Sequence, residues 1–316
     1  MAPARALFFG SGPFAVAVLD AVVGAPELAA AAVVTAPARP VGRRGIVTPT
    51  PVEGRARSLG LAVLAPARLR DPAFVATLVE LDLDVGILAD YGKLLPPPVL
   101  DSPRRGILNL HPSLLPRHRC ATPVPAAILA GDAETGVTLF RMDAGMDTGP
   151  VLAADRVAVG PDEDAPQLEE RLAAVAAGLL RRAIGPYLRG DLVPAPQPEA
   201  GVTVTRPLRR EDAWLDPALA AADLERRVRA FRPWPGAYLE LTSGRLAVLR
   251  AAAVPGDAAD EPGTLVADGR GLALATVSGR LSLALVQPAG GRPMDAAAFL
   301  RGHPGAAGAR AMGPAR

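Results

Sequence analysis

Short apolar runs alternate with segments of helical periodicity along the first half of the chain. Between the runs, for example in residues 14–23 and 72–81, apolar side chains recur at the three- and four-residue spacing of a helix. Strands that alternate with helices usually pair in parallel, so this half predicts an α/β domain with a parallel sheet covered by helices on both faces. The predicted strands are residues 6–10, 31–35, 61–65, 84–89 and 106–110.

The pattern changes after a long predicted helix, which begins near Pro166 and closes a first domain of residues 1–189. Residues 190–204 are rich in proline and have little periodicity, which is typical of an extended linker. Residues 205–303 predict a small, OB-like β-barrel, because short β-like runs are separated by turns. These runs are residues 246–249, 263–267, 272–277 and 281–286. The Pro- and Gly-rich tail, residues 304–316, is expected to be disordered.

Composition narrows the class of protein. The chain has 316 residues, of which 50% are hydrophobic and 21% charged, as in a folded protein of two domains. Its single cysteine, Cys120, excludes an internal disulfide framework and a cysteine-based zinc cluster. No apolar run reaches the roughly 18 residues of a membrane span, so we expect a cytoplasmic protein. Lys93 is the only lysine, and in so arginine-rich a chain an individual arginine is weak evidence for a nucleic-acid partner.

The residues with the clearest chemical potential lie between 106 and 150. This stretch contains N-L-H-P-S-L-L-P at residues 109–116 and, 31 residues after Pro116, Asp147 within D-A-G-M-D-T-G. Asn109 and His111 lie where a predicted strand ends, and ligands of parallel sheets bind at the carboxyl ends of the strands. Taken singly, Asn, His and Asp at such positions are usually turn, core or capping residues.

Together, the two motifs and their flanks resemble the catalytic signature of the 10-formyltetrahydrofolate-dependent formyltransferases. The resemblance implies a Rossmann-like catalytic domain, 10-formyltetrahydrofolate as co-substrate and no metal. Formyl transfer to an amine passes through a tetrahedral intermediate, which needs a donor for the oxyanion and a route for protons from the amine. Asn109 can supply the donor and His111 either function. An aspartate bonded to the imidazole, Asp147, would raise the pKa of His111 and fix its orientation.

The same resemblance implies folate contacts in two further segments. The residues of the first, which would shape the folate pocket, are Ser113, Leu114, Leu115 and Pro116. The loop that resembles the receiver of the pterin ring contains Asp90, Tyr91 and Gly92. The chain departs from the family pattern at three positions. The family usually has a large aromatic at the position of His118, Gly at that of Cys120, and Gln or Asn at that of Pro125. Cys adopts a positive φ less readily than Gly, so we expect the donor loop to differ in shape.

Two other features have simpler explanations. Residues 10–14, G-S-G-P-F, follow a strand and open a helix, but the third glycine of a dinucleotide-binding loop is missing, so we predict no nicotinamide cofactor. His118 and Cys120 lack further metal ligands at suitable spacing and are expected to be loop residues.

The acceptor amine is indicated by features outside the catalytic motifs. Residues 35–52 form a predicted long loop without periodicity, which resembles an insertion in the branch of the family that formylates methionyl-initiator-tRNA. Arg39, Arg43 and Arg44 would contact tRNA phosphates there, although residue types alone favour a solvated loop. Residues 230–236, A-F-R-P-W-P-G, resemble the carboxy-terminal domain of the same enzymes. A predicted helix with a basic face precedes them.

The resemblance runs from about residue 5 to residue 300 and implies a translation-initiation enzyme that uses methionyl-initiator-tRNA and folate, acting as a monomer. Two alternatives remain open from the sequence. The chain could formylate a nucleotide sugar or another small amine, because the catalytic residues do not distinguish acceptors. It could also be an inactive relative that binds folate or RNA, although retention of all three catalytic residue types argues against this.

Overall fold

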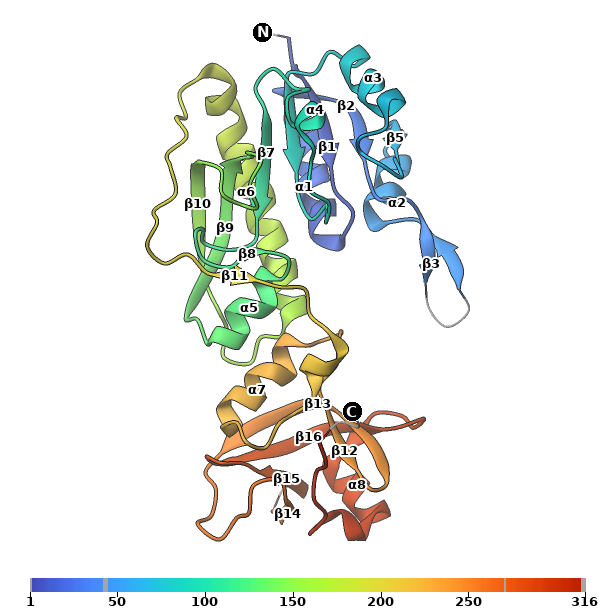
Figure 1. The fold of residues 1–316 in the computed structure, drawn as a ribbon, viewed down its shortest axis with the longest axis vertical. Coiled ribbons are helices and arrows are strands. Elements are labelled where there is room, and N and C mark those ends of the chain that lie inside the picture. The colour runs from blue at the N-terminus through green and yellow to red at the C-terminus, as the bar shows by residue number, and fades with distance from the viewer. Residues whose placement is uncertain (1, 42–44, 270, 314–316) are drawn as a thin grey trace. The chain divides into compact units, whose positions relative to one another are not determined.

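A computed structural model describes residues 2–41, 45–269 and 271–313. The chain divides into two compact units (Figure 1). The N-terminal unit comprises the residues up to 123, then 134–158 and 168–206, and the C-terminal unit comprises 124–133, 159–167 and the chain from residue 207 onward. The segment expected to be a linker, residues 190–204, is thus grouped with the N-terminal unit. None of the helices in the described part of the chain combines the length and apolar character needed to cross a membrane.

The N-terminal unit is built on a seven-stranded sheet in the order β10-β9-β7-β6-β1-β2-β5. Five neighbouring strands run parallel, which confirms the predicted α/β fold. They are β1 (Ala4–Phe9), β2 (Leu28–Val34), β5 (Val63–Leu64), β6 (Val85–Leu88) and β7 (Ile107–His111). Each coincides with one of the five predicted strands, because runs buried on both faces of a parallel sheet are apolar throughout.

Two antiparallel strands at one edge of this sheet were missed by the sequence analysis. They are β9 (Glu134–Arg141), which pairs with β7, and β10 (Val151–Ala158), which pairs with β9. In residues 153–158 of β10, half-buried and exposed side chains alternate, as expected for a strand at the edge of a sheet. The loop between β9 and β10 carries Asp147, so these strands decide where that side chain lies.

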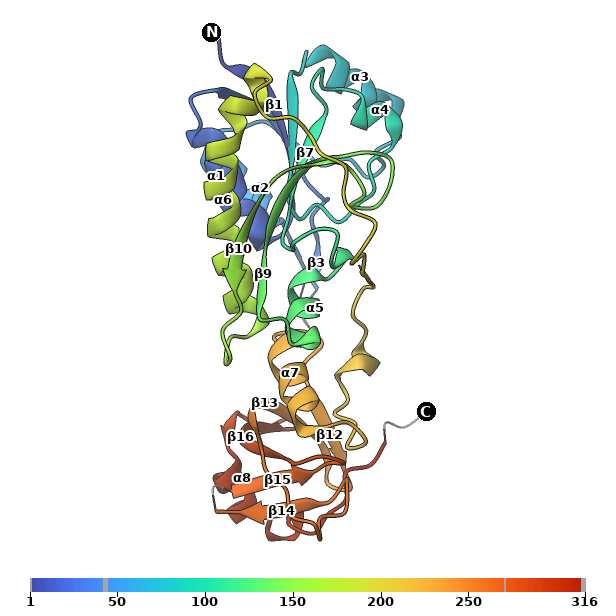
Figure 2. The ribbon, with the colours of Figure 1, turned by 90° about the vertical axis from the view of Figure 1, so that its left-hand side faces the viewer.

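Helices cover both faces of the sheet. Figure 2 shows α1 and α6 on one face and α3 and α4 on the other. The first five helices all begin with proline, whose fixed φ and missing N–H suit the first helical position. The helices of this unit are α1 (Pro13–Gly24), α2 (Pro51–Ser58), α3 (Pro72–Glu80), α4 (Pro97–Leu100) and α6 (Ala165–Arg189). Helix α5 (Pro123–Ala130) falls almost entirely in the C-terminal unit.

The predicted loop of residues 35–52 is partly regular. It contains the short antiparallel strands β3 (Arg39–Val41) and β4 (Ile46–Thr48), and Thr50 caps α2 by accepting a hydrogen bond from the backbone N–H of Glu53 at 3.0 Å. Ile46 and Val47 are largely exposed, so no apolar periodicity could reveal this hairpin. Arg39 lies exposed on β3, whereas Arg43 and Arg44 lie outside the described residues.

The C-terminal unit contains a six-stranded antiparallel sheet in the order β12-β13-β16-β15-β14, with β17 added beside β16. Its core gathers leucines from these strands together with residues from helices α7 and α8, such as Phe299. The predicted β-rich second domain is therefore observed. Its elements are η1 (Arg210–Ala213), α7 (Ala221–Ala230), β12 (Tyr238–Leu241), β13 (Gly244–Val254), β14 (Leu265–Asp268), β15 (Gly271–Ala275), β16 (Arg280–Pro288), β17 (Met294–Asp295), α8 (Ala296–Gly302) and η2 (Pro304–Ala306).

The tail expected to be disordered is instead hydrogen-bonded over residues 304–313, while 314–316 lie outside the described residues. The backbone N–H of Met312 donates to the carbonyl of Glu240 on β12, at 2.8 Å. A few residues earlier, the N–H of Leu265 on β14 donates to the carbonyl of Ala309, also at 2.8 Å. The tail thus pairs with the two edge strands of the sheet. Its small residues carry no periodic signal because the bonds are made by the main chain.

Candidate active site

Asn109 and His111 project from β7, and Asp147 reaches them from the loop between β9 and β10. Residues two apart on a strand point to the same face, so β7 directs both side chains to one side of the sheet. Asn109 and His111 are only 6% and 5% exposed, respectively, because β7 is flanked by β6 and β9. The structure therefore brings together the three residues that the sequence indicated as catalytic.

The Asp147 carboxylate is the centre of the group. Its Oδ1 lies 3.5 Å from Nδ2 of Asn109, and its Oδ2 lies 3.7 Å from Nδ1 of His111. The shortest contact comes from the main chain: the backbone N–H of Cys120 donates to Oδ2 of Asp147 at 2.7 Å. One carboxylate oxygen is thus fixed by a strong hydrogen bond while the carboxylate faces the side chains of Asn109 and His111.

The other side of the imidazole is also fixed by the main chain. Nε2 of His111 lies 2.9 Å from the carbonyl oxygen of His118. A carbonyl only accepts hydrogen bonds, so Nε2 carries the proton and Nδ1, which faces Asp147, is the basic nitrogen of the neutral ring. Burial lowers the pKa of His111, and the negative charge of Asp147 opposes that effect without overcoming it. The sequence motif predicts that Asp147 raises the pKa of His111, but desolvation of the ring outweighs this contribution.

Both main-chain contacts come from a short segment in an unusual conformation. Strand β8 (Arg119–Cys120) is preceded by His118, and the φ angles of His118 and Cys120 are +53° and +80°. Asp147 also has a positive φ, of +53°. Non-glycine residues rarely adopt this region. The sequence predicted an altered loop shape at Cys120 but not the hydrogen bonds that the main chain of His118 and Cys120 makes to His111 and Asp147. The one available signal was the departure from Gly at position 120.

The predicted folate residues after β7 form a braced turn. The hydroxyl of Ser113 donates to the carbonyl of Arg117 at 2.7 Å, and the backbone N–H of Leu115 donates to Oγ1 of Thr138 on β9 at 3.0 Å. Thr138 in turn donates to the carbonyl of Ser113 at 2.7 Å. Leu114 packs against Gly136, where an added Cβ would come within 2.6 Å of its side chain. The segment that ends at Pro116 is thus held rigidly against the strand next to β7.

Tyr91, from the predicted pterin loop, offers a group suited to a ligand. Its ring is buried and packs edge-on against Phe9, with the ring centroids 5.6 Å apart. Its hydroxyl is buried without a hydrogen-bond partner among the described residues, and burial raises the pKa of Tyr91 to about 12. A buried donor without a partner in the protein costs stability unless a ligand or water satisfies it. The residues at this position therefore fit a polar heterocycle.

Asp90 lies where the sheet order reverses, between the carboxyl ends of β1 and β6. Its carboxylate rests against Gly12, where a Cβ would come within 1.7 Å of Oδ2. This close approach explains the glycine in the loop after β1 without a dinucleotide. Asp90 is exposed at the surface, but the protein around its carboxylate partly desolvates it, and this desolvation, together with the nearby Glu169, raises the pKa of Asp90 to about 7.

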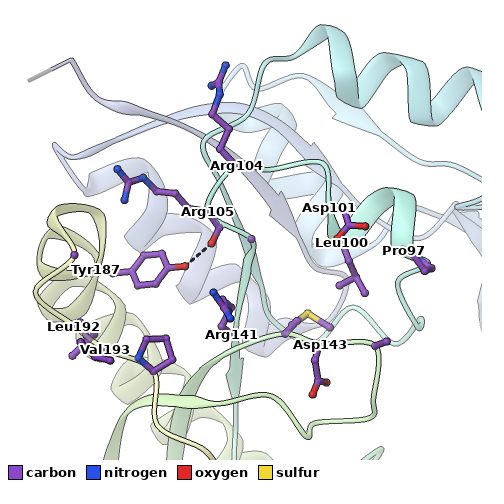
Figure 3. A pocket seen from close by; sticks show the side chains of 15 residues that line it. Pro97, Leu100, Asp101, Arg104, Arg105, Arg141, Asp143, Tyr187, Leu192 and Val193 are labelled. Atoms are coloured by element: carbon purple, nitrogen blue, oxygen red, sulfur yellow. Dashed lines mark hydrogen bonds between the residues drawn. The ribbon is translucent and has the colours of Figure 1, made fainter.

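A cavity of about 630 Å³ lies in the N-terminal unit, lined by α4, the residues just before β7 and the end of α6 (Figure 3). The hydroxyl of Tyr187 donates to the carbonyl of Arg105 at its wall. Its lining includes Arg104, Arg105 and Arg141, whose guanidinium groups do not converge on one point in Figure 3. The three catalytic candidates lie outside this lining, and the buried geometry around His111 is the better guide to the chemistry.

The predicted basic face of the helix before residue 230 is largely neutralised. On α7, Arg226 pairs with Asp223, and Arg229 pairs with Glu225 at 2.6 Å. The guanidinium of Arg227 donates to the carbonyl of Asp212 at 3.2 Å. These arginines are engaged within the C-terminal unit, so the helix does not present the cationic surface that the sequence suggested. Sequence spacing alone showed the charges and not their pairing.

Both units resemble known proteins. The sequence profile described as formyl transferase matches residues 4–184, and the one described as formyl transferase, C-terminal domain, matches residues 207–304. The methionyl-tRNA formyltransferase of Acidiphilium cryptum is 46% identical over 307 residues, which cover 97% of this chain and 99% of that protein. The methionyl-tRNA formyltransferase of a Roseiflexus species is 44% identical, covering 95% of this chain and 93% of that protein.

Solved structures share the same fold. The N-formyltransferase from Helicobacter canadensis, crystallised with folinic acid and dTDP-3-aminofucose, superposes with a TM-score of 0.67 over 89% of this chain and 99% of that one. Its sequence identity to this chain is 12%. At that identity the likeness concerns the fold alone.

Proposed function

The chain belongs to the formyl transferase family, and we propose that it transfers the formyl group of 10-formyltetrahydrofolate to the amino group of methionyl-initiator-tRNA, for translation initiation. The observation that carries the chemistry is the fixed His111 ring, whose Nε2 is bound by a carbonyl and whose Nδ1 faces Asp147. This arrangement leaves one basic nitrogen beside a carboxylate, as a proton acceptor requires.

The reaction begins when the methionyl nitrogen attacks the formyl carbon and the carbonyl π electrons move to oxygen. Asn109 donates a hydrogen bond to the oxyanion through an amide N–H that is not directed at Asp147. His111 Nδ1 takes the proton from the amine, and Asp147 stabilises the imidazolium that forms. When the intermediate collapses, the bond between the formyl carbon and N10 breaks, and N10 receives the proton from His111. The products are formylmethionyl-tRNA and tetrahydrofolate.

We assign folate binding to the two loops that follow β6 and β7. The buried hydroxyl of Tyr91, together with the carboxylate of Asp90, offers polar groups for the pterin ring, and Gly92 completes the loop. The braced turn of residues 113–116 supplies an apolar wall through Leu114 and Leu115. Because these groups are held before the ligand arrives, little ordering is needed on binding.

The choice of acceptor is supported by relatives that span nearly the whole chain, whereas the amino-sugar enzyme shares only its fold. We propose that Arg39, Arg43 and Arg44 contact tRNA phosphates, and that the protein acts in the cytoplasm as a monomer. Arg39 is exposed at the start of the β3–β4 hairpin, where a nucleic-acid backbone can reach it.

The direct test is an acceptor assay. The folded protein is incubated with 10-formyltetrahydrofolate and, in parallel, with methionyl-initiator-tRNA, an amino-sugar nucleotide or glycinamide ribonucleotide. Formylmethionyl-tRNA is the expected product. Formylation of a small acceptor alone would overturn the tRNA assignment, and turnover of none would overturn the enzyme assignment. Arg39→Ala and Arg43→Ala are expected to weaken tRNA formylation with a reduced salt dependence.

A further inference from the structure

The segment that supplies both main-chain contacts to His111 and Asp147 is held by a distant part of the chain. Strand β8 (Arg119–Cys120) pairs in parallel with β11 (Val204–Thr205), which lies at the end of the proline-rich segment 190–206. This small sheet consists of β8 and β11, so among the described residues β8 pairs with no other strand. Its position depends on that segment.

Thr203 and Thr205 hydrogen-bond to the main chain of β8 and of the residues beside it. The backbone N–H of His118 donates to Oγ1 of Thr203 at 2.7 Å, and the N–H of Arg119 donates to the carbonyl of Thr203 at 2.9 Å. The hydroxyl of Thr205 donates to the carbonyl of Arg119 at 3.0 Å and accepts from the N–H of Thr122 at 3.1 Å. These bonds offset the cost of holding His118 and Cys120 at positive φ.

Gln197 joins this segment to the Asp147 loop. Its Nε2 donates to the carbonyl of Asp147 and to the carbonyl of Gly149, both at 2.8 Å. Its Oε1 accepts from Nη2 of Arg119 at 2.7 Å and from Nε at 3.2 Å. A single half-buried amide therefore uses both donor hydrogens on the loop that carries Asp147 and its acceptor on the strand that carries Cys120.

We propose that Gln197 is a positioning residue for the catalytic group, which holds the Asp147 loop and strand β8 together so that the Asp147 carboxylate stays against His111. The proposal rests on the proposed function. The proline-rich segment thereby supports the catalytic group through Gln197. Pro196 and Pro198 flank Gln197 and restrict the backbone on both sides of it, which limits the positions that its side-chain amide can take.

The consequence of losing this amide follows from the geometry. Two carbonyls of the Asp147 loop and the guanidinium of Arg119 each lose a partner, so the hydrogen bond that the Cys120 N–H donates to Asp147 is left to hold the loop against β8, and the loop can shift. Displacement of a catalytic group by about 1 Å can reduce turnover by about 100-fold. Because Asp147 opposes the lowering of the pKa of His111, a displaced carboxylate lets that pKa fall further.

The test compares Gln197→Met with Glu199→Met in the full-length protein. Glu199 is exposed in the same segment, so its replacement by the same side chain is a matched control. For Gln197→Met we expect kcat to fall about 10- to 100-fold with KM for both substrates changed by less than about three-fold. We also expect the acid limb of the pH–kcat/KM profile to move to lower pH, which a change in overall stability alone does not produce. Glu199→Met should match the wild type in all three measurements.

A double-mutant cycle identifies the route of the effect. If Gln197 acts through Asp147, adding Gln197→Met to Asp147→Asn should reduce kcat little further. Should the methionine variant unfold, Gln197→Glu serves instead, because it keeps the acceptor for Arg119 and removes both amide donors. Wild-type kcat in the variant, or equal losses in both backgrounds, would overturn the positioning role. A wild-type protein without formyl transfer would instead overturn the proposed function.

Discussion

Asp147→Asn removes the charge opposite His111 and keeps the shape of the side chain. The carboxamide oxygen can still accept the hydrogen bond that the Cys120 N–H donates to Oδ2 of Asp147 at 2.7 Å, so the loop keeps its main anchor. What is lost is the negative charge 3.7 Å from Nδ1 of His111 and the Oδ1 acceptor 3.5 Å from Nδ2 of Asn109. In the proposed reaction this charge stabilises the imidazolium formed when the ring takes the amine proton.

The size of the effect follows from that distance. Two unit charges 3.7 Å apart interact by about 4 kcal/mol at an effective dielectric constant of about 20. Because about 1.4 kcal/mol corresponds to a factor of ten in rate, the full interaction would account for about 1000-fold in kcat. The Asp147 side chain keeps 14% of its exposure, and its charge is shared by two oxygens, which reduces this amount. We therefore expect kcat to fall by about 100- to 1000-fold.

The pH profile makes this prediction specific. Neutral His111 is the active form, so the acid limb of kcat/KM reports its protonation. Asp147 raises the pKa of His111 against the larger effect of burial, so removing the charge should move the acid limb to lower pH while the plateau falls. Formylation of methionyl-initiator-tRNA is measured from acid to neutral pH, with the exposed Asp101→Asn as a charge-matched control. An acid limb at the wild-type position, or one moved to higher pH, would refute the assignment of Asp147.

Three further predictions follow from individual residues. The pKa of Asp90, about 7, lies above its ordinary value of about 3.9. The folded protein therefore holds a proton that the unfolded chain releases between these values, and stability falls as pH rises through that window. Asp90→Asn should thus raise Tm at pH 8 and change it little near pH 4, and an unchanged difference across pH would contradict this. Cys120→Gly keeps the N–H that bonds to Asp147 and removes a Cβ at a φ of +80°. We therefore expect the free energy of unfolding, measured with denaturant, to rise by about 0.5–1 kcal/mol while kcat is preserved. A loss of stability would count against strain at this position. Deleting residues 308–316 removes the main-chain bonds to both edge strands of the C-terminal sheet and should lower its Tm, and an unchanged melt would show that the tail contributes nothing.

Much of the N-terminal fold was visible in the sequence because its strands are buried on both faces. The apolar runs that form β1, β6 and β7 were recognisable as buried strands, and the helices between them in the chain indicated parallel pairing. The strands β9 and β10 were harder to recognise. They follow one another directly and pair antiparallel, so no helix between them marked them as part of the alternating pattern.

The proximity of the three proposed catalytic side chains was also predictable, because Asn109 and His111 lie at the end of a recognisable strand and Asp147 lies in a motif of known spacing. The protonation of His111 was not. Its proton is placed by the carbonyl of His118, and its pKa is governed by burial more than by the neighbouring aspartate. Both are consequences of packing, which a sequence motif does not contain.

The remaining part of the site is invisible to sequence reasoning for a common physical reason. His118 and Cys120 contribute a carbonyl and an N–H, groups that every residue other than proline possesses, so their identities carry no signal beyond the departure from Gly at position 120. What is specific is the orientation of those groups, which requires two residues at positive φ and a partner strand more than 80 residues away. That partner lies in a segment whose composition predicts only an extended connection. A chain that must hold strained main chain beside a catalytic histidine needs hydrogen bonds from outside that stretch, and the segment carrying Gln197, Thr203 and Thr205 supplies them.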